Sequence, residues 1–389
     1  MPMKPAWTTA SALAFGLIGL TASCDTLIVA QDGSADFETI GAAIEAAVEG
    51  DLIFITAGTY LENDLIIDVP IMIEGELDAE LGPAVTIDGQ GGDLLYFTST
   101  SEEVVVKNLL LTGGGASSTM CFHSTPTLVN CTFIDNGPDT PAEFSFGSGM
   151  YNLNGAPSFI DCRFIGNRGG MGGAFSTWES GPSPENHPRF VRCLFRDNTA
   201  NYGGAMGNLR SNPTLIDCVF ENNIALTSGG AIYNEGFDGP DFWISRPIFE
   251  NCTFRNNVAA QNGGAIFNEG SSESTISESL FADNIAGSGG AIMSNGMSFS
   301  TLTNTTACGN LPDQLIGTWH DQGGNLISAE CPISCVGDLN GDGVVDGADL
   351  SILLGEWNQA SEDGDLNSDG IVDGADLTIL LGNWGPCPG

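Results

Sequence analysis

The chain has 389 residues, of which 42% are hydrophobic, and a formal net charge of −39 at pH 7. A polyanion of this kind is repelled by nucleic acid and by anionic membranes and attracts hard cations, so we exclude a nucleic-acid partner. With 53 glycines beside that apolar fraction, the composition predicts many turns between short buried strands and excludes a disordered acidic chain.

Residues 1–23 have the features of an export signal. Lys4 precedes an apolar run over residues 12–20 that is too short to span a bilayer, and residues 21–23 are small. Cys24 leaves a second route open, in which it becomes the acylated first residue of a lipoprotein. No other segment is long and apolar enough for a transmembrane helix. We therefore predict a protein that is secreted or held at the cell surface, where disulfides can form.

Short apolar runs alternate with glycine and aspartate turns through residues 27–111. Strands are predicted at 27–29, 52–55, 65–67, 71–73, 85–87, 94–97 and 104–111, with a Gly-Thr-Tyr turn at 58–60. Apolar residues recur at helical spacing over 40–48 and predict a short helix that ends at Gly50. Because no helices separate the later strands, the pattern favours a solenoid over a doubly wound sheet.

Two tetrapeptides repeat along the middle of the chain. Phe-x-x-Asn recurs at intervals of 25 to 34 residues and starts at Phe133, Phe164, Phe195, Phe220, Phe254 and Phe281, with a decayed copy at Ala307. Gly-Gly-Ala followed by an apolar residue starts at Gly172, Gly203, Gly229, Gly263 and Gly289. A period that varies with loop length predicts the stacked coils of a solenoid.

Stacked coils place equivalent residues over one another at about 4.8 Å. In each Cys-x-Phe segment both residues face the same way and are predicted to point inward. Each repeat Asn suits a tight turn in which its amide bonds to the Asn of the next coil, and each Gly pair suits a sharp bend with positive φ. Cysteine recurs at one repeat position, which predicts a column of small buried thiols, and the alternative is a metal site. The cysteines at this position are Cys131, Cys162, Cys193, Cys218 and Cys252.

These segments resemble two kinds of β-helix protein. Residues 29–37, with Gly-Thr-Tyr at 58–60, resemble the capping region of pectin-methylesterase-type β-helices. The tandem Phe-x-x-Asn and Gly-Gly-Ala-Ile units resemble the repeats of polymorphic outer-membrane proteins. The resemblance covers about residues 27–310 and implies a mainly β chain, a right-handed parallel β-helix with an N-terminal capping helix.

The signatures of pectin-active enzymes with this fold do not occur in the sequence. Residues 143–147, Glu-Phe-Ser-Phe-Gly, resemble the Asp-Phe-x-Phe-Gly signature of pectin methylesterases without its aspartate, and no Gly-His-Gly of a polygalacturonase is found. The arginines all lie between Arg163 and Arg255. They leave two interpretations open: solvated residues paired with carboxylates, or a basic patch for an acidic polysaccharide that includes Arg163, Arg196 and Arg255.

Two acidic loops near the C-terminus have the spacing of calcium ligands. Calcium loops carry oxygen ligands at positions 1, 3, 5, 9 and 12, a backbone carbonyl at position 7 and Gly at position 6. The loop over 338–349 and its copy over 365–376 both fill this pattern, which predicts two Ca²⁺ sites. The ligands are Asp338, Asn340, Asp342, Val344 through its carbonyl, Asp346 and Asp349, then Asp365, Asn367, Asp369, Ile371 through its carbonyl, Asp373 and Asp376.

Each loop leads into a helix, and the paired units resemble a type I dockerin. The apolar faces of these helices are predicted to be Leu350, Leu353, Leu354 and Trp357, and Leu377, Leu380, Leu381 and Trp384. The resemblance implies a small all-α module and a cohesin-like protein partner, bound through loop positions 10 and 11. These are Gly347 and Ala348 in the first copy and Gly374 and Ala375 in the second, where many dockerins carry Ser and Thr. Cys335 and Cys387 flank the module and are predicted to close it by a disulfide.

The sequence thus predicts an export signal over 1–23, a β-helix over 24–333 and a dockerin-like calcium module over 334–389. The favoured function is an extracellular polysaccharide-binding or scaffold protein attached to partners through the calcium module, because the known catalytic signatures fail. The alternative is a polysaccharide lyase or glycoside hydrolase acting on acidic polysaccharides, with catalytic residues that the sequence does not identify.

Overall fold

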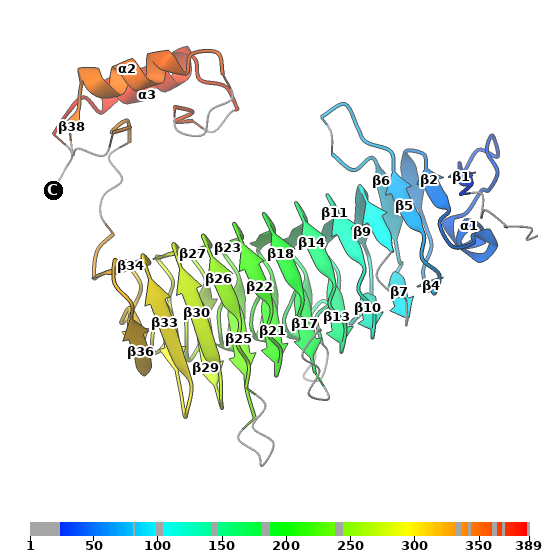
Figure 1. The fold of residues 1–389 in the computed structure, drawn as a ribbon, viewed down its shortest axis with the longest axis horizontal. Helices are drawn as coiled ribbons and strands as arrows, with labels where there is room; N and C mark the ends of the chain where they lie inside the picture. Colours follow the sequence, from blue (N-terminus) through cyan, green and yellow to red (C-terminus); the bar gives the residue numbers. More distant parts are fainter. Residues whose placement is uncertain are drawn as a thin grey trace, which may run out of the picture.

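The computed structural model describes residues 24–80, 82–98, 104–141, 146–179, 187–237, 244–331, 336–340, 344–359, 364–367 and 370–386. From residue 26 to residue 328 the chain winds into stacked coils whose strands pair in parallel with those of the next coil (Figure 1). Parallel strands joined by crossovers of the favoured hand give a right-handed β-helix, as predicted. The export signal, Asp342, Asp369, Cys335 and Cys387 lie outside the described residues.

Three long parallel sheets form the walls of the β-helix. A fourth, shorter parallel sheet contains strands that lie along the chain between those of sheets B and C. Sheet A consists of β1 (Thr26–Val29), β2 (Leu52–Ile55), β5 (Met72–Gly75), β8 (Val105–Lys107), β11 (Thr127–Val129), β14 (Ser158–Ile160), β18 (Arg189–Val191), β22 (Thr214–Ile216), β26 (Ile248–Glu250), β30 (Glu273–Ser277), β33 (Phe299–Thr303) and β36 (Thr318–Asp321). Sheet B consists of β3 (Gly58–Tyr60), β6 (Val85–Asp88), β9 (Leu109–Thr112), β12 (Thr132–Ile134), β15 (Arg163–Ile165), β19 (Leu194–Arg196), β23 (Val219–Glu221), β27 (Thr253–Arg255), β31 (Leu280–Ala282), β34 (Thr306–Cys308) and β37 (Leu326–Ser328). Sheet C consists of β4 (Leu65–Ile67), β7 (Leu95–Thr98), β10 (Thr119–Phe122), β13 (Met150–Leu153), β17 (Phe175–Trp178), β21 (Met206–Leu209), β25 (Ile232–Glu235), β29 (Ile266–Glu269), β32 (Ile292–Ser294) and β35 (Leu315–Ile316). Sheet D consists of β16 (Arg168–Met171), β20 (Thr199–Tyr202), β24 (Ile224–Ser228) and β28 (Val258–Ala259).

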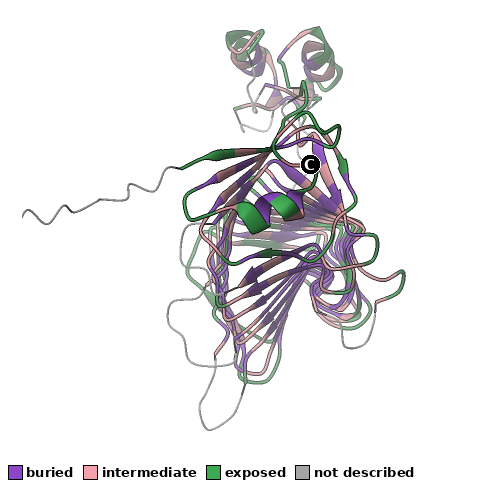
Figure 2. Cartoon of the chain, turned by 90° about the vertical axis from the view of Figure 1, so that its right-hand side faces the viewer, coloured by how far each residue is buried: buried purple, intermediate pink, exposed green. Residues whose placement is uncertain are grey.

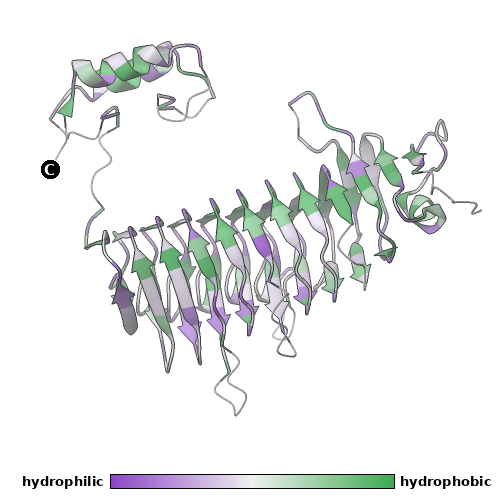
Figure 3. Ribbon diagram, viewed as in Figure 1, coloured by the Kyte–Doolittle hydropathy of each residue, from purple (hydrophilic) through white to green (hydrophobic). Residues whose placement is uncertain are grey.

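The interior of the β-helix is a dry core in which like residues stack. Figure 2, which looks along the rod, shows the inward sides of the strands as buried. The repeat phenylalanines of sheet B form a stack whose neighbouring rings lie nearly parallel, with centroids 4.7 Å apart for Phe133 and Phe164 and 4.5 Å apart for Phe195 and Phe220. Hydrophobic residues therefore recur at the same place in successive coils (Figure 3). The predicted inward Phe column is confirmed.

The repeat asparagines form a continuous buried ladder of hydrogen bonds. The Nδ2 of Asn167 donates to the Oδ1 of Asn198 at 3.1 Å and to the carbonyl oxygen of Phe133 at 3.0 Å. The same pattern connects Asn136, Asn167, Asn198, Asn223, Asn257, Asn284 and Asn310. The amide-to-amide bonds were predicted, but the left-handed residue of the turn is the one before the Asn, as at Asp197 with φ 58°.

The first glycine of each repeated pair bends the chain before sheet C. Gly203 and Gly229 have φ of 61° and 70°, as predicted for this position. The second glycine is needed for a different reason. A Cβ on Gly230 would lie 1.9 Å from the carbonyl oxygen of Gly264 in the next coil, so the coils can stack only where this position has no side chain.

The repeat cysteines form the predicted inward column of buried, unoxidised thiols. The Sγ of Cys162 lies 3.4 Å from the carbonyl oxygens of Leu128 and Ile160, to which its thiol can donate. Burial raises the pKa of the Cys162 thiol well above its ordinary value. The column is thus a set of small apolar side chains packed beside the Phe stack.

Replacing one of these cysteines is expected to cost little. Cys162→Ala removes one buried sulfur and leaves a small cavity, so the free energy of unfolding should fall by about 1 kcal/mol. Denaturant unfolding of the variant would measure this. Mass spectrometry of the alkylated native protein should find Cys162 and Cys193 unmodified and reduced, and either residue in a disulfide would contradict the assignment.

The N-terminal end of the core is closed by a short helix. α1 (Ile40–Ala46) begins after Thr39, whose hydroxyl accepts from the backbone N–H of Ala42, and it buries Ile40, Ala43 and Ile44 over the first coils. Figure 2 shows it lying across the end of the rod. The predicted helix is therefore confirmed as the cap, but it ends at Ala46 rather than at Gly50.

Two details of the first coils differ from the prediction. Gly58–Tyr60, predicted as a turn, is strand β3 and starts sheet B by pairing with β6. The run over 104–111, predicted as one strand, divides into β8 and β9 at Asn108, which has φ of 58°. The side chain of Asn108 accepts from Nδ2 of Asn130 at 3.0 Å, which supports the corner between sheets A and B.

A disulfide closes the last coils. Cys308, at the end of β34, is bonded to Cys331, 23 residues later. The sequence did not single out this pair, because neither residue occupies the repeat position of the buried thiols.

The C-terminal module has its own small core. It contains β38 (Val344–Val345), α2 (Gly347–Gly355), α3 (Gly374–Gly382) and β39 (Gly385–Pro386), and Val345, Leu353, Val372 and Leu380 are its buried residues. The predicted apolar faces are wrong at three positions, since Leu354 and Leu381 are both 51% exposed and Trp384, which follows α3, is 49% exposed. Within the described residues, no helix is long and apolar enough to cross a membrane.

Candidate functional sites

The two predicted calcium loops have the same internal hydrogen bonds. Asp349 Oδ1 accepts from the backbone N–H of Leu339 at 2.8 Å and of Asn340 at 3.1 Å, and its Oδ2 accepts from Asp346 at 2.8 Å. In the second loop, the carboxylate of Asp376 accepts from Asn367 at 3.1 Å and from Asp373 at 2.8 Å. The residue at position 12 therefore ties the start of each loop to its end.

Hydrogen bonds at loop position 12 favour the ionised form of its aspartate. Burial alone would raise the pKa of Asp349, but the backbone N–H donors of Asp346, Asn340 and Leu339 outweigh it and lower that pKa. The pKa of Asp376 is lowered by the same balance. Asp346 and Asp373 cap α2 and α3 by accepting from Ala348 and Ala375 at 2.7 Å.

The oxygen-rich donor set of these loops fits a hard cation such as Ca²⁺. Gly370, at position 6 of the second loop, has φ of 95° and donates to Oδ2 of Asp365 at 2.8 Å. Among the described residues, which lack Asp342 and Asp369, no three acidic, His or Cys side chains already gather as a metal cluster. Hydrogen bonds therefore hold the two ends of each loop together, and binding of Ca²⁺ by the predicted ligands stays a prediction.

The predicted partner-binding residues lie on the surface at the start of the two helices. Gly347 and Ala348 are exposed in the first turn of α2, and Gly374 and Ala375 are exposed at the equivalent place in α3. They are small and carry no charged group, and their role in partner binding stays a prediction.

The three predicted glycan-binding arginines share the outer face of sheet B. Arg196 and Arg255 occupy one register column with Glu221 between them, whereas Arg163 lies in the other outward column. The Nε of Arg255 is 3.3 Å from Glu221 and the Nε of Arg196 is 3.4 Å from Asp197. Arg196 and Arg255 therefore share a column, and the guanidinium of each has a carboxylate neighbour.

Aromatic side chains gather on the outer face of sheet C. Tyr96, Tyr151, Tyr233 and Phe267 lie in one outward register column of β7, β13, β25 and β29. The chain has five tyrosines, and only Tyr60, which is buried in β3 of sheet B, lies away from this face. We call the set the aromatic strip: Tyr96, Phe122, Phe146, Tyr151, Trp178, Tyr202, Tyr233 and Phe267.

Ring contacts divide the strip into two groups. In the first, Phe146 stacks on Tyr151 at 4.7 Å and lies 6.0 Å from Trp178. In the second, Tyr202 from sheet D lies 5.2 Å from Tyr233, and Tyr202 is 37% exposed. Nothing in the sequence spacing of Trp178, Tyr202 and Tyr233 places them on one face, so the strip is apparent only in the structure.

Two carboxyl groups meet at Tyr233. The phenol oxygen of Tyr233 lies 3.3 Å from Oε2 of Glu235 on the same strand and 2.7 Å from Oε2 of Glu269, which faces Glu235 on the neighbouring strand β29. Burial, then the charge of Glu269, raises the pKa of Glu235, while Tyr233 and Arg210 act in the opposite direction. Burial and both carboxyls also raise the pKa of Tyr233. Sequence reasoning missed this cluster, which we call the Tyr233 cluster.

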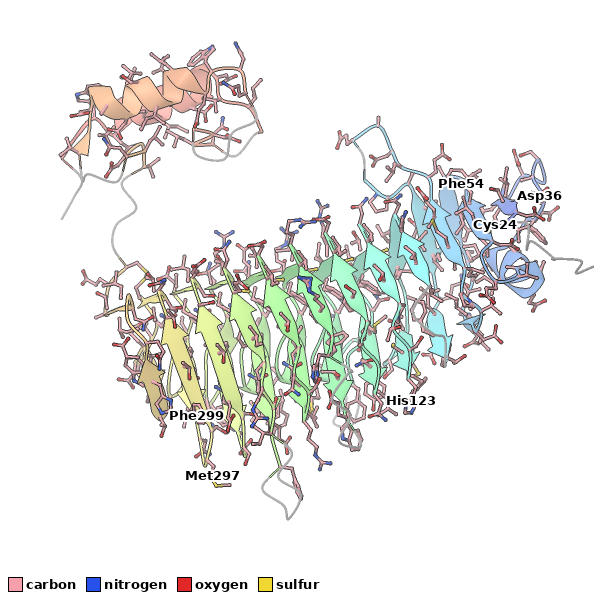
Figure 4. The ribbon with its side chains drawn as sticks, viewed as in Figure 1. Cys24, Asp36, Phe54, His123, Met297 and Phe299 are labelled. Atoms are coloured by element: carbon pink, nitrogen blue, oxygen red, sulfur yellow. A yellow bond between two sulfur atoms is a disulfide. The ribbon has the colours of Figure 1, made fainter. Side chains whose placement is uncertain are left out.

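The turns that follow sheet C form one long edge of the rod beside this face. His123, after β10, and Met297, after β32, are both labelled on this edge in Figure 4. His123 has φ of 47°, and Asn154 and Arg210 take left-handed conformations at the equivalent turns of later coils. The edge is therefore built from a repeated turn, and it positions the end of each sheet C strand.

Comparison with known proteins identifies part of the repeat. The Chlamydia polymorphic membrane protein repeat matches residues 217–235 and 251–269, which contain β23 to β25 and β27 to β29. This match confirms the predicted resemblance over those two units. No curated protein matches the chain in sequence.

Several solved structures are similar to the chain at low identity. ORF18 of Geobacillus virus E2 is 15% identical, with 78% of this chain and 60% of that chain covered and a TM-score of 0.39. Alginate lyase AlyF-OU02, in a complex with G6, is 14% identical, with 78% and 62% covered and a TM-score of 0.42. Pectate lyase Pel9A is 11% identical, with 91% and 90% covered and a TM-score of 0.37. The chain thus spans less than two thirds of the first two proteins.

Proposed function

We propose that the chain is an exported polysaccharide-binding protein whose β-helix holds the glycan and whose C-terminal module attaches it to a partner. The observation that supports this best is the aromatic strip, in which Tyr202 is exposed and Trp178 is partly exposed, while Tyr151, Tyr233 and Phe267 are buried. Aromatic rings offer sugars a flat apolar surface with a polar edge, and a polymer can follow a strip that extends over several coils.

Export is supported by the disulfide and by the acidic surface. The bond between Cys308 and Cys331 suits a secreted or cell-surface protein. Lipidation at Cys24, which is exposed, is the second route to the same compartment.

The C-terminal module is proposed to bind two calcium ions and to dock a cohesin-like protein. Bound Ca²⁺ would neutralise the carboxylates that each loop brings together, and so stabilise the folded loop. Asp338, Asn340, Asp342, Asp346 and Asp349, with the carbonyl of Val344, would hold one ion, and Asp365, Asn367, Asp369, Asp373 and Asp376, with the carbonyl of Ile371, the other. The exposed Gly347, Ala348, Gly374 and Ala375 would form the docking surface.

Removing aromatic rings from the strip is expected to weaken glycan binding. Trp178→Ala and Tyr202→Ala each remove a partly exposed ring, and a loss of stacking worth about 1.4 kcal/mol reduces affinity about tenfold. Affinity electrophoresis through gels containing neutral or acidic polysaccharides would measure this. Phe299→Ala is the control, because Phe299 projects from the outer face of sheet A against His320 (Figure 4). If the intact protein is retarded by none of the polysaccharides, the proposed function is wrong.

A second candidate, binding of acidic polysaccharide on sheet B, rests on the shared column of Arg196 and Arg255. A charged polymer held there should dissociate as salt rises, because exposed charges are screened beyond about 8 Å at physiological ionic strength. The double variant Arg196→Ala and Arg255→Ala should weaken retardation by alginate and polygalacturonate without changing the unfolding midpoint. Because both arginines already have carboxylate neighbours, we expect this effect to be smaller than that of Trp178→Ala.

A further inference from the structure

Sheet D and its continuation carry an exposed column of aliphatic side chains. Ile224 of β24 pairs with Val258 of β28, and β-bridges continue the register to Ile285 and Leu311 in the next two coils. These four side chains are 43%, 36%, 45% and 56% exposed, in that order, and Leu226, close to Ile224, is 51% exposed. We call these five residues the aliphatic ladder.

The ladder differs from other outward positions of the rod. On sheets A and B, the exposed Ile248 and Leu280 are each followed by a threonine in the next coil. Single exposed apolar residues are ordinary on a soluble protein, whereas contiguous ones mark an interaction surface. The inner side of sheet D is already filled by Ala200, Ala225 and Ala259, so packing of the coils does not explain large apolar side chains on its outer side.

We propose that the aliphatic ladder is the interface of a reversible dimer, in which a second copy of this chain packs its own ladder against it with the rod direction reversed. A surface that contacts itself about a two-fold axis must be self-complementary. The ladder has this property because its side chains recur at the coil spacing of about 4.8 Å, so those of one copy fit between those of the other. The inference concerns assembly of the chain and does not depend on glycan binding.

The area of the ladder fits a reversible interface. Its side chains present roughly 400 Å² of apolar surface, a size that marks a functional patch on a monomer. Two ladders would bury about 800 Å² together, and the polar groups at their edges would add to this area. Specific interfaces bury about 1,200 Å² or more and transient ones less, so dimer and monomer should be in equilibrium.

The distribution of charge favours a second copy as the occupant. A chain with a net charge of −39 repels another copy over most of its surface. Eight of its ten basic residues lie between Arg163 and Arg255, in coils that also contribute to sheet D. The ladder residues themselves are uncharged. Repulsion between two copies is therefore weakest where these coils face each other.

Charged residues beside the ladder favour the reversed orientation. Arg255 lies three residues before Val258 and Asp283 two before Ile285, and both charged side chains are exposed. A two-fold axis between Val258 and Ile285 would place each Arg255 beside Asp283 of the second copy, whereas parallel rods would put the two charged rows on opposite sides of the interface. Arg255 is 3.3 Å from Glu221 but has a half-exposed side chain, so its guanidinium can donate to a second carboxylate.

Sedimentation velocity of the full-length protein at rising concentration should show a monomer–dimer equilibrium. Ile285→Glu places two like charges at the centre of the interface and should weaken dimerisation about 100-fold, with the unfolding midpoint unchanged. Ile248→Glu is the matched control, because Ile248 on sheet A is 42% exposed, and it should leave dimerisation unchanged. A protein that stays monomeric at every concentration, or an Ile285→Glu variant that dimerises normally, overturns the inference, and the ladder then faces a different partner.

A mixing experiment tests the orientation. Arg255→Asp and Asp283→Arg each create two like-charge pairs in the reversed dimer, so each variant alone should dimerise about tenfold more weakly. Mixed together they form two opposite-charge pairs and should dimerise as well as the unmodified protein. Asp283→Arg suits the backbone, because Arg192 and Arg210 already take the left-handed conformation of Asp283. If the mixture dimerises no better than either variant alone, the reversed arrangement is wrong.

Discussion

Removal of calcium is expected to unfold the C-terminal module while the β-helix stays folded. Each loop concentrates carboxylates that repel one another unless a cation lies between them, and metal binding that creates its own site contributes folding free energy. Among its described residues the module has four fully buried apolar side chains, so its core alone supplies little stability. Limited proteolysis with and without chelator, followed by mass spectrometry, should show that 336–386 becomes sensitive and 26–328 does not.

Substitution of Asp349 should have a similar effect in the presence of calcium. Asp349→Ala leaves the backbone N–H groups of Leu339, Asn340 and Asp346 without their acceptor, and each such group costs about 1–3 kcal/mol when buried. Asp376→Ala tests the second copy in the same way. Ser351→Ala, on the exposed side of α2, is the control. A module that resists protease equally with calcium and with chelator would rule out the calcium assignment.

Asn198→Ala is expected to be the most damaging single substitution in the β-helix. It removes an amide that accepts from Asn167 and donates to Asn223 and to the carbonyl oxygen of Phe164, all inside the core. Four buried polar groups lose a partner, namely the backbone N–H and Nδ2 of Asn167, the carbonyl oxygen of Phe164 and Oδ1 of Asn223, so we expect a loss of about 4 kcal/mol. The transition is better described by its midpoint than by one free energy, because repeat proteins need not unfold in a single step.

Two comparisons make this test specific. Asn198→Asp keeps the acceptor but places a carboxylate opposite the carbonyl oxygen of Phe164 and Oδ1 of Asn223, and it should lower the midpoint at least as much. Gln261→Ala removes an exposed amide on the same rod and should leave the midpoint unchanged. If Asn198→Ala unfolds at the same denaturant concentration as Gln261→Ala, the ladder does not stabilise the fold.

Much of the β-helix could be predicted from the sequence because a solenoid repeats its interactions. A residue at one repeat position meets the same kind of residue in the next coil, so the Phe-x-x-Asn and Gly-Gly-Ala spacing sufficed to predict the Phe stack, the Asn ladder and the bends. The cap was predictable for a local reason, since an amphipathic segment beside the first strand must bury its apolar face. The calcium loops were predicted from ligand spacing alone, and their occupancy stays a prediction.

The tertiary structure decided what lies between repeat positions. Tyr202 and Tyr233, or Glu235 and Glu269, come from different strands, and their contacts depend on the register of β20, β25 and β29 and on sheet D lying beside sheet C. The break at Asn108 and the disulfide from Cys308 to Cys331 follow no repeat and gave no periodic signal. A sequence period specifies which residues point inward, because burial selects them strongly. The outer face is selected only weakly by folding, so the groups that meet there become known only when the coils are stacked.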